Sequence, residues 1–142
     1  MSPTAASRLA EHLTHRKPAD SGRLADVGDR LRFVWPPEFI ELFGITDGGE
    51  GWVGESYLSI FSVDELRDRN EPEFWPDLVL FGSDGGGEGF ALRRSSHPPD
   101  IVMANLVGPD PAIPQGDMAT FLGRLELATL FDPLSSRDIG ER

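Results

Sequence analysis

The stretch Phe33-Val34-Trp35-Pro36-Pro37-Glu38-Phe39-Ile40-Glu41-Leu42-Phe43 decides the fold, and the acidic turn Asp47-Gly48-Gly49-Glu50-Gly51 follows it closely. Pro37 predicts the start of a helix, because a proline in the first helical turn leaves no hydrogen bond unmade. The apolar residues after it, Ile40 among them, supply a buried face. The Asp-Gly-Gly sequence predicts the helix end, since glycine tolerates positive φ. The stretch holds no nucleophile, general base or metal-ligand set, so it indicates a fold better than a reaction.

The composition is that of one soluble domain. A chain of 142 residues with 39% hydrophobic residues has the size and apolar content for a packed core. It contains no cysteine, which excludes disulfides and thiolate metal sites. No apolar run approaches the length that a bilayer requires, and residues 1–17 lack the apolar core of a signal peptide. We therefore expect a cytoplasmic protein that does not bind membranes.

The net charge of −11 is unevenly distributed along the chain. Residues 1–37 carry six basic and four acidic residues, a net of +2, which leaves −13 on residues 38–142. A surface that acidic repels phosphate, so we expect no nucleic-acid binding. It would instead attract a basic protein and speed their encounter. The alternative is that the acidic residues only keep a small domain soluble.

Periodicity and capping signals predict an α+β fold. Helices are expected over residues 5–16, 23–31 and 37–43, after a capping box formed by Ser62 and Glu65, and after an N-cap at Asp117. Strands are expected over residues 57–61, 78–82, 89–94 and 101–104, with a hairpin turn over 83–88 and a proline-rich loop over 107–115. The prediction is an antiparallel sheet of about four or more strands covered by helices.

The expected domain organisation has three parts. Residues 1–21 form an N-terminal extension, in which the thin apolar stripe of Leu9 and Leu13 predicts a loosely attached helix. Residues 22–131 form the single α+β domain, and residues 132–142 form a frayed tail.

Five motifs, in this order and spacing, resemble those of the SUKH superfamily. They are the aromatic–Pro-Pro–Glu-Phe helix, the Asp47-Gly48-Gly49 helix stop, the strand-to-helix step over 58–66, the hairpin over 80–92 and the helix over 118–122. The resemblance covers residues 23–125. The family's helix stop often reads Asn-Gly-Gly, and the aspartate at position 47 tolerates the same turn geometry.

The resemblance implies a fold without catalysis. Many bacterial members of the superfamily are immunity proteins, which bind and neutralise toxins, often nucleases, delivered between competing cells. By that likeness we expect an immunity protein that neutralises a basic, nuclease-type toxin through an acidic surface, as a monomer or a homodimer. The alternative is a regulatory or scaffold module that binds a housekeeping partner, because fungal members regulate cell-wall synthesis. The resemblance names no specific toxin.

The expected partner-binding residues lie in two acidic, glycine-rich segments, and a third acidic segment over 65–77 adds to this surface. They are Asp47, Glu50, Trp52, Glu55, Asp84 and Glu88. The tryptophan stands between glycines and glutamates, and tryptophan is enriched among the residues that dominate binding energy. Its alternative role is to fill the core. Trp35, by contrast, is expected to fill the core above the helix that begins at Pro37.

Other chemistries find poor support in the residues. The glycines over 82–89 lack a Lys-Ser/Thr ending and precede a strand, so they do not match a phosphate-binding loop. The carboxylates nearby do not have the spacing of a calcium loop, and the histidines follow no zinc pattern. We expect no enzyme activity, no metal and no cofactor. A hydrolase or ligand-binding domain remains an alternative that requires a pocket with converging polar groups.

Overall fold

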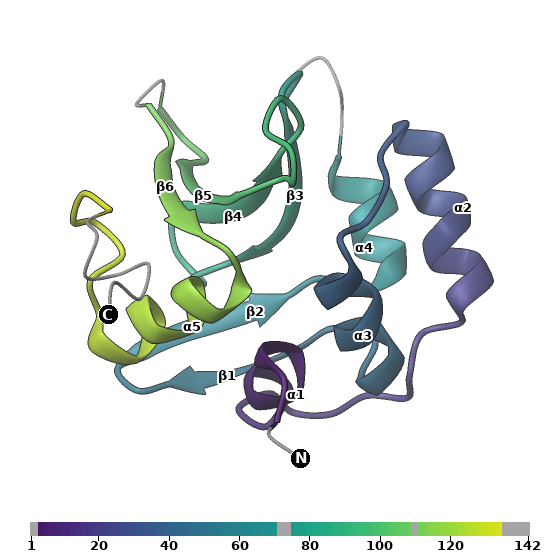
Figure 1. The fold of residues 1–142 in the computed structure, drawn as a ribbon, viewed down its shortest axis with the longest axis horizontal. Coiled ribbons are helices and arrows are strands. Elements are labelled where there is room, and N and C mark those ends of the chain that lie inside the picture. The colour runs from purple at the N-terminus through teal and green to yellow at the C-terminus, as the bar shows by residue number, and fades with distance from the viewer. Residues whose placement is uncertain (1–2, 71–74, 109–110, 135–142) are drawn as a thin grey trace.

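The computed structural model describes residues 3–70, 75–108 and 111–134 and confirms the expected α+β class (Figure 1). The helices in these residues are α1 (Ala5–Ala10), α2 (Ser21–Leu31), α3 (Pro37–Ile45), α4 (Val63–Arg69) and α5 (Met118–Leu127). The strands are β1 (Gly49–Val53), β2 (Ser56–Ile60), β3 (Leu78–Ser83), β4 (Glu88–Arg93), β5 (Ile101–Asn105) and β6 (Ile113–Gly116).

The six strands form one antiparallel sheet in the order β1-β2-β3-β4-β5-β6, so each strand pairs with its neighbour along the chain. The sheet curls strongly, with the β1–β2 hairpin lying across the base of the molecule and the other strands rising from it (Figure 1). The register of β3 against β4 shifts between Leu80 and Gly82. A shift of this kind bends a strand and increases its twist, in keeping with the curl.

Two of these strands, β1 and β6, contradict the loops expected at their positions. The first is rich in glycine and the second contains Pro114, and both features disfavour strand formation locally. Each lies at an edge of the sheet and pairs with only one neighbour. Pairing with β2 and with β5 therefore overrides the local preference.

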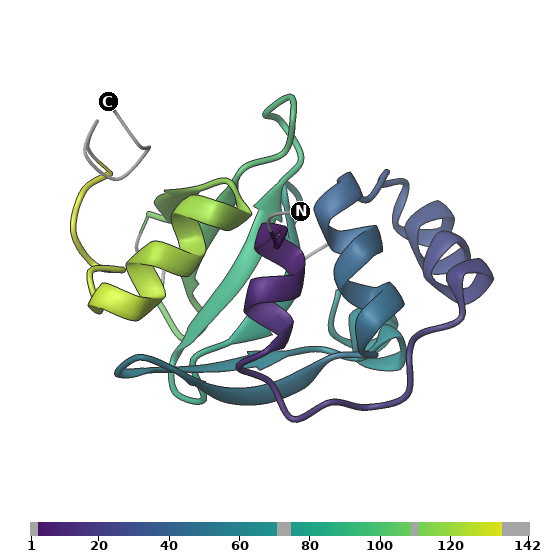
Figure 2. The same ribbon diagram turned by 60° about the horizontal axis from the view of Figure 1, so that its bottom comes forward.

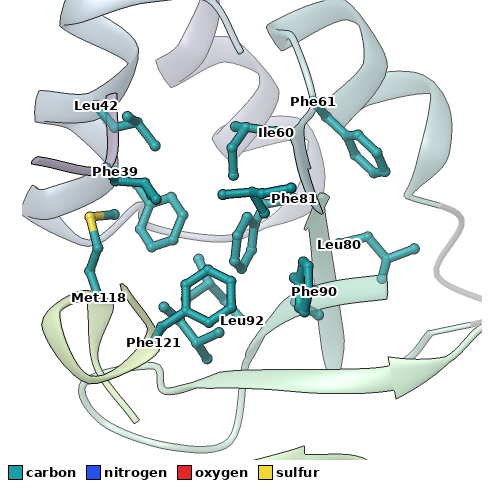
Figure 3. Packing of buried hydrophobic residues seen from close by; sticks show 14 of the residues in the cluster. Phe39, Leu42, Ile60, Phe61, Leu80, Phe81, Phe90, Leu92, Met118 and Phe121 are labelled. Atoms are coloured by element: carbon teal, nitrogen blue, oxygen red, sulfur yellow. The ribbon is translucent and has the colours of Figure 1, made fainter. Parts of the chain in front are cut away.

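Aromatic rings form the centre of the core where α3 and α5 pack on the sheet (Figure 3). The Phe39 ring lies 4.8 Å from that of Phe81, and the Phe121 ring lies 5.0 Å from that of Phe90, both in edge-to-face geometry. Trp35 is buried, as expected, and its indole N–H donates to the Leu24 carbonyl over 3.0 Å. This bond joins α2 to the segment that begins α3.

The helix signals of the sequence are confirmed at single residues. Pro37 is the first residue of α3, and the Ser62–Glu65 capping box is present with both reciprocal hydrogen bonds. Asp117 caps α5 by accepting from the Thr120 N–H over 2.9 Å. The prediction that Ile40 belongs to the core is wrong, because its side chain is 50% exposed. The buried residues of α3 lie at i, i+3 and i+4 from Phe39, and Ile40 falls outside that stripe.

The expected loose attachment of the N-terminal helix is also wrong. Helix α1 is shorter than expected but packs against α3 and α5, with Leu9 fully buried beside two buried alanines. The small alanine side chains allow this close approach, which a count of large apolar residues does not reveal. The chain after α1 then runs beside β1, where the Thr14 N–H donates to the Glu50 carbonyl over 2.8 Å.

Two glycines of β1 make this crossing possible. A Cβ atom placed on Gly51 would lie less than 3.0 Å from the His12 carbonyl oxygen, and one on Gly49 would also lie less than 3.0 Å from that of Thr14. Any larger residue at either position would push residues 12–14 off the strand. The glycines of the predicted acidic turn therefore serve the packing of the N-terminal segment.

Near the C-terminus, the buried Arg124 holds the chain that follows α5. Its guanidinium donates to Gln115 over 2.6 Å and to the main-chain carbonyls of Leu130 and Asp132. The predicted frayed tail begins at Asp132, and its part from residue 135 onward lies outside the described residues. Residues 71–74, which belong to the third predicted acidic segment, also lie outside them.

We expect Gly51→Ala to destabilise the fold by about 1–3 kcal/mol, the usual cost of overpacking, because the His12 carbonyl is main chain and cannot rotate away. Gly44→Ala is the matched control. A Cβ there meets no atom within 4 Å, so this helical position should gain about 0.5–1 kcal/mol. Urea denaturation of both variants measures the difference, and equal stabilities would contradict the crossing.

Candidate functional site

The outer face of the β1–β2 hairpin is the most distinctive exposed surface of the fold. Side chains alternate between the two faces of a strand, so Val53, Leu58 and Ile60 are buried toward the helices. Glu50 and Trp52 point to the other side. Figure 2 shows the hairpin along the lower edge of the molecule, with α1 and α5 on one side of it. On the opposite side, Glu50 and Trp52 are exposed.

Tyr57 contacts two other side chains on this side, and we call the three residues the hairpin face: Glu50, Trp52 and Tyr57. Trp52 and Tyr57 are directly paired across the strands, with ring centroids 5.4 Å apart and planes inclined by 68°. The tyrosine hydroxyl donates to the Glu50 carboxylate. Trp52 is 64% exposed. A large aromatic surface and an oriented carboxylate thus stand side by side in solvent.

The β3–β4 turn borders the hairpin face through Gly85. A Cβ atom on this glycine would lie 3.0 Å from the Tyr57 ring, so the main chain of the turn lies against that ring. The φ of Gly85 is +83°, a conformation that glycine adopts without strain. The turn therefore fixes Tyr57 from one side while the tyrosine orients Glu50.

The structure separates the six predicted site residues into two groups. Glu50, Trp52 and Glu55 lie together on the hairpin and are exposed. Asp47 is half-buried, and its carboxylate accepts from the Val63 N–H over 2.8 Å at the start of α4. Asp84 shapes the β3–β4 turn.

The Asp84 carboxylate accepts from the Gly86 N–H over 2.8 Å and from the Glu88 N–H over 3.3 Å. Glu88 begins β4 beside this turn and is half-buried. Asp84 and Asp47 thus have structural roles, whereas Glu50, Trp52 and Glu55 lie outside the buried core.

Tyr57 is the residue of this surface that the sequence reasoning missed. The sequence predicts a strand at this residue and no binding role for it, although the alternation with Leu58 and Ile60 places it on the outer face. Once β1 is known to be a strand, its pairing with Trp52 follows from the hairpin register.

The strands that form and border the hairpin face carry no basic residue. The sequence contains no lysine, arginine or histidine over residues 33–66 or 70–92. These ranges include all of β1, β2, β3 and the β3–β4 turn. Glu50 and Glu55 on the hairpin therefore meet no compensating cation from these elements, and the local field is negative.

A second, apolar surface lies on either side of the segment Phe33–Trp35. A hollow of about 230 Å³ between α2 and α3 is lined mainly by apolar side chains, with Val34 86% exposed at its rim. A larger hollow of about 690 Å³ on the other side includes Arg94 and Asp117. Arg94 donates to the Arg32 carbonyl over 3.2 Å, and Asp117 caps α5. The sequence does not predict this surface, because Trp35 and Ile40, which line the smaller hollow, are expected core residues.

In the described residues, no group of histidine, cysteine, aspartate or glutamate side chains is placed to hold a metal ion. None of the helices there combines the length and apolarity needed to cross a bilayer. A scan against models of known protein families and a search of curated proteins both find no match.

The pKa of Tyr57 is raised above its ordinary value of 10.0. The main cause is the hydrogen bond to Glu50, which favours the neutral phenol; burial and the negative charge of Glu50 act in the same direction. Because the folded-state pKa is the higher one, this contribution to stability is complete below pH 10.0 and is lost as the pH rises through the folded value.

We expect Glu50→Gln to lower the pKa of Tyr57 toward 10.0, because the amide carries no charge and is a weaker acceptor. Tyr57 is the only tyrosine of the chain, so phenolate absorbance against pH reports this residue alone. Glu55→Gln is the control, since it removes the same charge from the hairpin without touching the hydrogen bond. If both variants shift the midpoint equally, the direct bond is disproved.

Proposed function

We propose that this chain is a non-catalytic protein-binding domain that neutralises a basic, nuclease-type bacterial toxin. The observation that carries the proposal is the hairpin face, where Trp52 is 64% exposed on a surface whose strands contain no basic residue. The resemblance of the sequence to the SUKH superfamily supports an immunity role. In that role the protein acts in the cytoplasm, without metal or cofactor.

An exposed tryptophan in an acidic setting has the properties of a binding anchor. Tryptophan is prominent among the residues that dominate interface energies, because it buries a large area at small cost in side-chain entropy. Trp52 has its indole held beside Tyr57 in edge-to-face contact, so part of the ordering is already present before binding. The fold itself gains little from leaving this side chain in water.

The acidic surroundings select a basic partner and speed its arrival. Nuclease domains bind a polyanion and therefore carry basic active-site surfaces. Glu50 and Glu55 would attract such a surface at a distance and discriminate against acidic proteins. Docking there would occlude the toxin's substrate site, with carboxylates in the place of the substrate's phosphates.

The function is tested by affinity capture of tagged protein with the products of its neighbouring genes, followed by growth rescue. We expect one basic protein at stoichiometric level, toxic when expressed alone and harmless when this chain is co-expressed. Capture of a housekeeping protein that is not toxic would contradict the proposal and favour the regulatory module. Failure of rescue with a toxic captured partner would contradict neutralisation.

Variants then test the surface. Trp52→Ala should weaken binding of the captured protein by about tenfold or more, as expected for an interface anchor. Val34→Ala, an exposed change on the apolar surface, should leave binding unchanged. Charge reversal at Glu50 and Glu55, or a rise from about 0.1 M to about 1 M salt, should also weaken it. Binding that is indifferent to salt and to charge reversal would contradict an electrostatic mode.

A further inference from the structure

We infer that Glu50, Trp52 and Tyr57 form a recognition site for one arginine side chain of the partner protein. The inference rests on the proposed function only in assigning that arginine to the toxin. Charge complementarity identifies the occupant, since the hairpin presents carboxylates and its strands contain no cation. An anionic ligand such as a phosphate would be repelled from the same face.

The aromatic component supplies a surface for a cation. The two rings meet in edge-to-face geometry, with planes inclined by 68°, and most of Trp52 remains exposed. Tryptophan is the strongest of the aromatic side chains in cation–π contacts, which extend to about 6 Å from the ring centroid. A cation resting on this indole has no competing positive charge on β1, β2 or β3.

The carboxylate component is already oriented. Tyr57 donates its hydroxyl to one oxygen of Glu50, and the main chain of Gly85 lies against the tyrosine ring. A carboxylate has two oxygens and accepts several donors, so this bond leaves capacity for a ligand. Glu50 and Trp52 are two residues apart on one face of β1, a separation of roughly 7 Å along the strand.

This combination fits arginine better than lysine. The planar guanidinium is weakly hydrated, stacks on aromatic faces and presents several N–H donors along its edge. It can lie on the indole while its edge reaches toward the neighbouring carboxylate. The ammonium group of lysine is a strongly hydrated point charge that has no flat face to stack. The site should therefore distinguish two side chains of equal charge.

The test uses the full chain and three short probes: Ac-Gly-Arg-Gly-NH2, its lysine counterpart and its citrulline counterpart, the neutral isostere of arginine. NMR follows the indole N–H of Trp52 and the amide of Gly54 at the hairpin turn. We expect saturable shifts with the arginine peptide and severalfold weaker binding of the lysine peptide. The citrulline peptide should cause no shift.

Variants separate the three contributions. Glu50→Gln should weaken binding of the arginine peptide by about fivefold or more, because the charged pair is lost. Trp52→Leu, followed at Gly54, should abolish the preference for arginine over lysine, because an aliphatic side chain has no π face. Tyr57→Phe keeps the ring and should weaken binding only through loss of carboxylate orientation. Val34→Ala should have no effect on any of these values.

Two outcomes would overturn the inference: equal shifts with arginine and lysine peptides that vanish together in about 1 M salt, or equal shifts with arginine and citrulline. The first would indicate diffuse acidic attraction, and the second a contact without charge recognition. If the arginine peptide fails while a basic toxin is still captured and neutralised, the arginine site alone is disproved. If the peptide binds but no basic toxin is captured, the proposed function is disproved and the site remains.

Discussion

The close crossing of residues 12–14 over the glycines of β1 is the constraint on which the candidate site depends. Gly49 and Gly51 leave no room for a side chain beneath the His12 and Thr14 carbonyls. Because the side-chain period of a strand is two, this fixes Glu50 and Trp52 on the opposite face. A slip of one residue would bury a carboxylate and an indole under residues 12–14 and expose glycines. The N-terminal segment thus determines which face of the hairpin meets solvent.

The core and the candidate site are built from different residues. Phenylalanines from α3, α5 and the central strands fill the core, and Trp35 connects α2 to it. The hairpin face adds an aromatic pair and a carboxylate that the core does not use. The residues of the hairpin face can therefore change without altering the core. The two aspartates among the predicted site residues belong with the fold, because each accepts main-chain hydrogen bonds at a turn or helix start.

Signals confined to a few consecutive residues were predictable from the sequence. Pro37, the Ser62–Glu65 capping box and the Asp117 cap each act through one helical turn, and each is confirmed. The β3–β4 hairpin was also predictable, since continuous apolar runs on both sides of a glycine turn leave few other arrangements. These features need no information about distant parts of the chain.

Features set by distant contacts were not predictable. The glycines of β1 predict a loop, and only the close crossing of residues 12–14 explains why they stand in a strand. Strand β6 forms only through its pairing with β5. The burial of α1 depends on alanines that fit closely against α3 and α5. The contact of Tyr57 with Trp52 depends on β1 being a strand that pairs with β2. Charge and the tryptophan alone indicated Glu50, Trp52 and Glu55, half of the predicted site residues, but in an expected loop. The hairpin and its register are what group them.

Two exposed surfaces are candidates for docking the proposed partner, and one spectrum distinguishes them. The hairpin face carries Trp52, whereas Trp35 lines the apolar hollows beside α2 and α3. The most direct measurement is the NMR spectrum of the tryptophan indole groups with and without the captured basic protein. Binding at the hairpin face predicts a large shift of the Trp52 signal and an unchanged Trp35 signal. A shifted Trp35 signal with Trp52 unchanged would contradict the account.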